Sequence, residues 1–194
     1  MLFRLRWWVG LLVVAANLHA QIVSSPRYQL FGGYSYLSNS LNGVSGSQHS
    51  LSGYEIAFAI PPWHHLRYKM NVFQYSGKNQ GAAEHPYFVM AGGQYGKGFG
   101  REYAFVEAMG GVGNVNKDWG ANQTVGNTAS FSALLGGGLD TPLSQHFSFR
   151  VQGDYQYAYF KQEATRNPGT GVPTYVPGLP TNFGRISTGI VWRF

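Results

Sequence analysis

Apolar and polar residues alternate strictly over long stretches of this chain. In the segment 147–159, one set of alternate positions is Phe, Val, Gly or Tyr, and the other is Ser, Arg, Gln and Asp before Ala158. Successive side chains of a β-strand point to opposite faces, so this pattern predicts a strand with one apolar and one polar face. Eight such segments occur, each about ten residues long, the length that a tilted strand needs to cross a membrane. In chain order they are 28–37, 51–60, 66–75, 86–95, 102–112, 130–139, 147–159 and 183–194.

The connections between these segments alternate in length. Four are long and rich in Gly, Ser, Asn or Pro: 38–50, 76–85, 114–129 and 160–182. Three are short: 61–65, 96–101 and 140–146. This alternation is typical of an up-and-down barrel with long external loops and short periplasmic turns. The sequence therefore predicts an all-β fold, an eight-stranded antiparallel up-and-down transmembrane β-barrel.

The charged residues of the eight segments fall on one face, with Glu102, at the start of its strand, as the exception. An Arg or Lys that faced the middle of a bilayer would cost about 2–4 kcal/mol, which explains an outer face without charge. A soluble barrel would show the reverse, an apolar interior and a polar exterior. We therefore expect the charged face to line the interior and the apolar face to contact outer-membrane lipid.

The predicted interior carries a set of opposite charges. Its members are Glu55, Arg67, Lys69, Glu107, Arg150, Asp154, Arg185 and Arg193. An eight-stranded barrel is only wide enough for its own side chains, so we interpret this set as an ion-pair network that fills the interior. A conducting pore or a ligand site is the alternative. The five bases and three acids would then favour anions.

Aromatic residues dominate the outward face near the strand ends, which predicts aromatic girdles at the two membrane interfaces. They are Tyr34, Tyr36, Tyr54, Tyr87, Tyr95, Tyr155, Tyr157, Tyr159 and Trp192.

The first twenty residues have the pattern of a secretory signal peptide. Arg4 and Arg6 precede an apolar run at 7–16, and a small-residue cleavage signal ends at Ala20. The run is too short for a transmembrane helix. The predicted domains are therefore a signal peptide, 1–20, and one barrel domain, 21–194. The chain contains no Cys, which excludes a lipid-anchored cysteine and disulfides.

The last strand resembles the terminal strand of bacterial outer-membrane barrels, which the barrel assembly machinery reads. Ser187, Gly189, Trp192 and Phe194 match its polar-x-Gly-x-x-apolar-x-Phe pattern. Further stretches extend the resemblance along the chain: 31–37 (FGGYSYL), 136–140 (GGGLD), 146–150 (HFSFR) and 189–194 (GIVWRF). Together they are similar to the OmpA-like family of small outer-membrane β-barrels. This resemblance implies eight strands, location in the bacterial outer membrane and no universal catalytic residues.

Candidate catalytic and ligand sites are few. His146 and Ser148 are similar to the His-x-Ser of outer-membrane lipid A deacylases, but the expected lumen position and the missing acid argue against catalysis. Adjacent His64 and His65 would point oppositely on an extended chain, which disfavours a shared metal. The net charge is +6, but the basic residues form no cluster, which argues against nucleic acid. The sequence thus predicts no cofactor.

The leading functional hypothesis is a non-enzymatic barrel that stabilises the envelope or binds an unknown partner through its external loops. The segment 160–182 is the best partner-binding candidate, because four prolines make it partly rigid. A narrow porin or small-ligand channel is the alternative. A lipid-modifying outer-membrane enzyme is the third possibility.

Overall fold

The computed structural model describes residues 27–38, 50–79, 82–118, 124–125, 130–160, 162–166, 173–177 and 180–194. The predicted signal peptide, 1–20, lies outside the described residues, as do parts of the predicted loops. Within the described part of the chain, no helix has the length and apolar character needed to cross a membrane.

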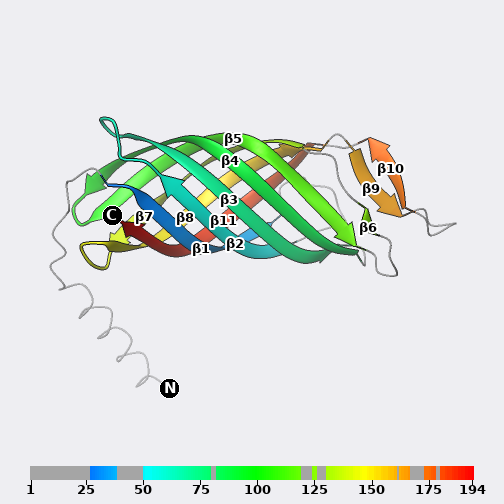
Figure 1. The fold of residues 1–194 in the computed structure, drawn as a ribbon, viewed down its shortest axis with the longest axis horizontal. Coiled ribbons are helices and arrows are strands. Elements are labelled where there is room, and N and C mark those ends of the chain that lie inside the picture. The colour runs from blue at the N-terminus through cyan, green and yellow to red at the C-terminus, as the bar shows by residue number, and fades with distance from the viewer. Residues whose placement is uncertain are drawn as a thin grey trace, which may run out of the picture.

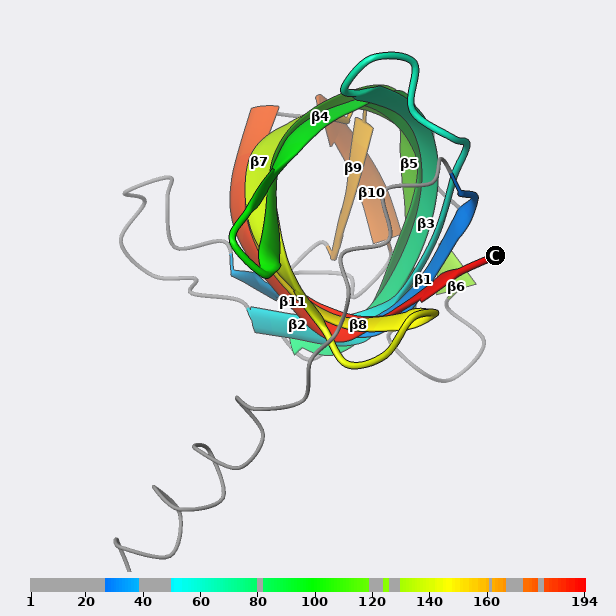
Figure 2. The ribbon, with the colours of Figure 1, turned by 90° about the vertical axis from the view of Figure 1, so that its left-hand side faces the viewer.

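Eight antiparallel strands form a closed barrel, as the sequence predicts (Figures 1 and 2). Their order around the wall is β4-β3-β2-β1-β11-β8-β7-β5, and pairing of β4 with β5 closes the ring. The wall strands are β1 (Gln29–Ser38), β2 (Ser50–Ala59), β3 (Leu66–Asn79), β4 (Ala82–Phe99), β5 (Glu102–Asp118), β7 (Ser130–Pro142), β8 (Phe147–Tyr159) and β11 (Pro180–Arg193). Closure pairs every wall strand on both sides, which a sheet surrounded by lipid requires.

The first and last wall strands, β1 and β11, pair with each other. Cα pairs run from Gln29 with Arg193 to Ser38 with Gly184, as closure of the predicted eight-stranded barrel requires of its first and last strands. Two backbone hydrogen bonds extend the ladder, one from each of Tyr28 and Phe194 to the carbonyl of the other, at 3.1 and 3.2 Å. We call this pairing of β1 with β11 the seam.

Five wall strands, β3, β4, β5, β7 and β11, are longer than the sequence predicts, whereas β1, β2 and β8 have the predicted length. β4 has 18 residues and β5 has 17, so the predicted loop 76–85 is wrong: most of it continues the β3–β4 ladder, for example Gly77 with Glu84. The predicted turn 96–101 shrinks to Gly100 and Arg101. Residues that favour turns, such as Gly, Ser and Asn, join the ladder here because a neighbouring strand pairs with their backbone.

Three short strands lie at the end of the barrel where the long connections emerge, which we call the loop end. β6 (Thr124–Val125) pairs with the tip of β5. β9 (Gln162–Arg166) and β10 (Pro173–Pro177) form a separate hairpin within the predicted loop 160–182. Figure 1 places this hairpin beyond the barrel wall, and Figure 2, along the barrel, places it within the outline of the ring. The hairpin therefore lies across the opening at the loop end.

The two faces of the wall have the predicted orientation. Inward Glu55 and Arg185 are each 1% exposed, whereas outward Ile56 is 62% exposed. The opposite end of the barrel, which we call the turn end, carries the C-terminus and the turns after β2, β4 and β7 (left in Figure 1). At Gly100 the chain turns with a φ of +63°, a conformation that glycine adopts without strain.

Candidate functional site: the barrel interior

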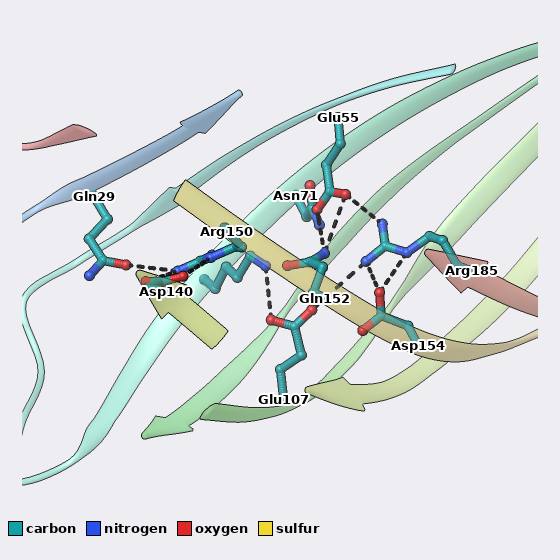
Figure 3. Close-up of polar contacts among 10 residues, drawn as sticks. Gln29, Glu55, Asn71, Glu107, Asp140, Arg150, Gln152, Asp154 and Arg185 are labelled. Carbon is teal, nitrogen blue, oxygen red and sulfur yellow. Dashed lines mark hydrogen bonds and ion pairs between the residues drawn. The ribbon is translucent and has the colours of Figure 1, made fainter. Parts of the chain in front are cut away.

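The guanidinium of Arg185, on β11, is the centre of the interior charges (Figure 3). Its Nε donates to Oδ2 of Asp154 at 2.8 Å, and its Nη1 donates to Oε2 of Glu55 at 3.1 Å. Its Nη2 lies 3.9 Å from Oε1 of Glu107. The guanidinium carbon also lies 4.4 Å from the ring centroid of Phe73. Strands β2, β5, β8 and β11 are thereby connected through one buried cation.

Other polar side chains complete this central cluster. Nζ of Lys69 lies 2.8 Å from Oε2 of Glu107. Nδ2 of Asn71 and Nε2 of Gln152 donate to Oε1 of Glu55 at 2.6 and 3.0 Å. Charge-assisted bonds of this kind are stronger than neutral ones, and they offset the cost of burying charge.

A second cluster lies toward the turn end, around Asp140. Arg150 binds this carboxylate twice, from Nε at 2.6 Å and from Nη2 at 2.8 Å, and Arg193 Nη2 lies 2.8 Å from it. The Arg150 guanidinium also lies over the rings of Phe31 and Phe105, 5.3 and 4.5 Å from their centroids. Asp140 is thus the anion that holds this cluster together.

Asp140 is absent from the predicted interior set because the sequence pattern places it in the turn 140–146, whereas β7 continues to Pro142. The alternation through Leu134, Gly136 and Gly138 carries on to Asp140 and is the signal that identifies it. With this fourth acid against five bases, the interior set carries a net +1 rather than +2.

Arg67 stands apart from both clusters. Its Nη1 donates to the backbone carbonyl of Arg27 at 2.9 Å, and its guanidinium lies 5.9 Å from the Tyr103 ring centroid. The structure therefore distributes the eight predicted residues among a central cluster, a turn-end cluster and this isolated cation.

The interior toward the loop end contains an unpredicted cluster of apolar side chains, beside the buried polar residues Ser35, Ser132 and Gln156. We call this cluster the apolar plug. Its members are Leu37, Leu51, Phe73, Tyr75, Phe88, Met90, Met109, Leu134, Ala158 and Phe183. The rings of Phe73, Tyr75 and Phe88 pack within about 6.5 Å of one another. Side chains thus fill the barrel between the central cluster and the loop end.

A glycine makes room for the central cluster. A Cβ on Gly136 would lie 1.8 Å from Oδ1 of Asp154, so any larger residue would displace the carboxylate that binds Arg185.

The candidate catalytic and metal residues are dispersed. Ser148 is buried and accepts a hydrogen bond from Arg193, whereas His146 is exposed in the turn. His64 packs against Trp63 and His65 against Tyr95, with ring centroids 5.1 and 5.9 Å apart. No group of three or more His, Asp or Glu suited to a metal occurs among the described residues.

The predicted girdle residues lie on the outer face, where all but half-buried Tyr157 are exposed. At the turn end an aromatic row crosses the seam. Ring centroids are 4.6 Å apart for Trp192 and Phe194, 6.0 Å for Phe194 and Tyr28, and 5.8 Å for Tyr28 and Phe58.

The other two residues of the predicted assembly signal point to the seam and the interior. Ser187 is buried, and its Oγ donates to Oγ of Ser35 at 2.9 Å. A Cβ on Gly189 would lie 2.2 Å from the carbonyl oxygen of Gly32 on β1.

No model of a known protein family matches the chain, and neither does the sequence of any curated protein. Several solved structures share its fold. Neisserial surface protein A aligns with a TM-score of 0.62 at 14% identity over 87% of this chain and 96% of its own. Ail, the attachment invasion locus protein of Yersinia pestis, gives 0.56 at 12% identity over 88% and 99%. The outer membrane protein OprG from Pseudomonas aeruginosa gives 0.58 at 12% over 88% and 96%. By its fold, the protein is a small eight-stranded outer-membrane-type β-barrel.

Proposed function

We propose that the protein resides in the bacterial outer membrane as a non-conducting, non-enzymatic barrel that strengthens the envelope and binds partners at its loop end. The filled interior carries this proposal. Ion pairs around Arg185 join four strands of the barrel wall, and the apolar plug lies between these ion pairs and the loop end. A hydrated ion would have to lose its water to pass the plug, which is costly in an apolar medium.

The orientation follows from the connections, since short turns of such barrels face the periplasm and long loops face outside. The loop end then presents the β9–β10 hairpin and the extended tips of β3, β4 and β5 to the exterior. A rigid barrel with strands that protrude at one end is suited to binding a partner at that end. One structural neighbour is named for attachment: Ail is the attachment invasion locus protein of Yersinia pestis, and one structure of Ail is a complex with the heparin analogue sucrose octasulfate.

Planar-bilayer recordings of the refolded protein test the closed interior. We expect no ion-conducting steps from the natural sequence. The double variant Phe73→Ala with Arg185→Ala removes a stacked pair that joins the plug to the central cluster, and we expect it to conduct. Stable conductance from the natural sequence would contradict the proposal and favour the narrow channel.

Mass spectrometry of lipid A tests the enzymatic alternative. Cells that produce the barrel should contain the same lipid A species as cells that do not. A new deacylated or otherwise modified species that disappears in Ser148→Ala would establish an enzyme instead.

A further inference from the structure

Lys97, on β4, breaks the pattern that keeps charge inside the barrel. It lies close to the Gly100 turn on the outward face, together with Tyr95 and Phe99, and it is exposed. The lysine makes no ion pair with any of the described residues. A lysine at the end of a membrane strand extends its ammonium toward the interface, where lipid phosphates lie.

A hollow of about 420 Å³ lies beside this lysine on the outer wall. Its lining includes Tyr95, Lys97 and Phe99 from β4 and Ala104 and Val106 from β5. Lys97 is paired with Ala104 and Tyr95 with Val106, so the small Ala104 side chain leaves space between larger neighbours. Apart from the lysine, the side chains around the hollow are those that contact hydrocarbon readily.

From this hollow toward the middle of the barrel, small residues line the outer wall, and the Leu66 side chain of β3 lies beside Gly93. The next outward pairs are Gly93 with Ala108 and Ala91 with Gly110, and Ala133 of β7 lies beside Gly110. A Cβ on Gly110 would meet no atom within 4 Å, so packing of the wall does not require glycine at this position. The small residues instead leave a shallow strip on the surface.

We propose that this site binds one phospholipid with an anionic headgroup, its phosphate on Lys97 and an acyl chain in the hollow and along the strip. The inference rests on the proposed outer-membrane residence, in which the turn end faces the periplasmic leaflet. The nearby Glu102 carboxylate accepts a hydrogen bond from Thr141 at 2.7 Å. The ammonium of Lys97 therefore supplies the positive charge that complements a phosphate.

Native mass spectrometry tests this site on protein inserted into vesicles of phosphatidylethanolamine with phosphatidylglycerol and then released into mild detergent. We expect one retained phosphatidylglycerol per barrel. Lys97→Gln should lower that adduct about fivefold, the effect of one basic side chain at a lipid surface. The matched control is Lys78→Gln, which alters an exposed lysine at the loop end and should leave the adduct unchanged.

Filling the hollow separates the acyl contribution from the charge. Ala104→Leu should lower retention of phosphatidylglycerol and phosphatidylethanolamine equally, whereas Lys97→Gln should lower retention of the anionic phosphatidylglycerol more than that of phosphatidylethanolamine. Equal retention in Lys97→Gln and the natural sequence, or equal loss in Lys78→Gln, would overturn the site. A lipid-free dimer that Ala104→Leu disrupts would overturn it as well and assign the face to a second copy. Insertion is measured separately by heat-modifiable gel mobility, so failed insertion would count against the proposed function and not against this site.

Discussion

Arg185 shows how much depends on one residue of the interior. Its side chain is fully buried and compensates carboxylates from three other strands, Glu55, Glu107 and Asp154. Removal of one partner from a buried ion pair typically costs about 3–5 kcal/mol, because the remaining charge loses its compensation. We expect Arg185→Gln to lower the free energy of unfolding by this amount in urea titrations of the protein in lipid vesicles. Arg67→Gln is the control and should cost less, since Arg67 binds a backbone carbonyl; equal losses would refute the central role of Arg185.

Val151 and Arg150 are adjacent on β8, and substitutions of Val151 test whether the outer face of the wall contacts hydrocarbon. Val151 is 46% exposed on the outer face, whereas Arg150 is buried against Asp140. Val151→Arg would place a cation in hydrocarbon and should cost about 2–4 kcal/mol near the bilayer midplane. Val151→Leu is the matched control and should be nearly neutral in the same vesicle titration. If both variants were equally stable, the outer face would not contact hydrocarbon.

At the scale of elements, the residues of the predicted assembly signal lie at the seam between β1 and β11. Phe194 packs between Trp192 and Tyr28, and each such aromatic pair contributes about 0.5–1.5 kcal/mol. We expect Phe194→Ser to lower stability modestly but to reduce the amount of protein in the outer membrane strongly, because the last strand resembles the strand that the barrel assembly machinery reads in outer-membrane barrels. Membrane fractionation measures the yield. Phe99→Ser, an exposed aromatic away from the seam, should leave the yield unchanged, and an unchanged yield for Phe194→Ser would contradict the signal.

The β9–β10 hairpin forms a sheet separate from that of the barrel wall. Its strands pair only with each other among the described strands. Replacement of residues 161–179 by a short turn should therefore preserve heat-modifiable mobility and the unfolding midpoint in urea. The same replacement should abolish binding of a partner that contacts the loop end. A collapse of the midpoint would show that the hairpin supports the wall.

At the scale of the whole molecule, the number, order and facing of the strands follow from the sequence, because most wall strands have an apolar outer face and carry their charged residues on the inner face. The limits of the strands do not follow, since residues such as Gly77 look like turn formers until a partner strand pairs with them. The apolar plug could not be predicted from the alternation of apolar and polar residues. Inward Phe73 and Phe88 each sit beside an outward Val, so the contrast between faces disappears and the pattern no longer shows which side is inside.

The seam also determines how the chain must fold. Gln29 pairs with Arg193, at nearly opposite ends of the described chain, so the ring cannot form until β11 is in place. A chain that lacks β11 has two unpaired edges, on β1 and β8, which invite pairing with other chains. Contacts so distant in sequence also form slowly, because a long loop must be ordered first. The time needed for ring closure, rather than the strength of any one strand pair, therefore sets the period in which this protein is open to aggregation.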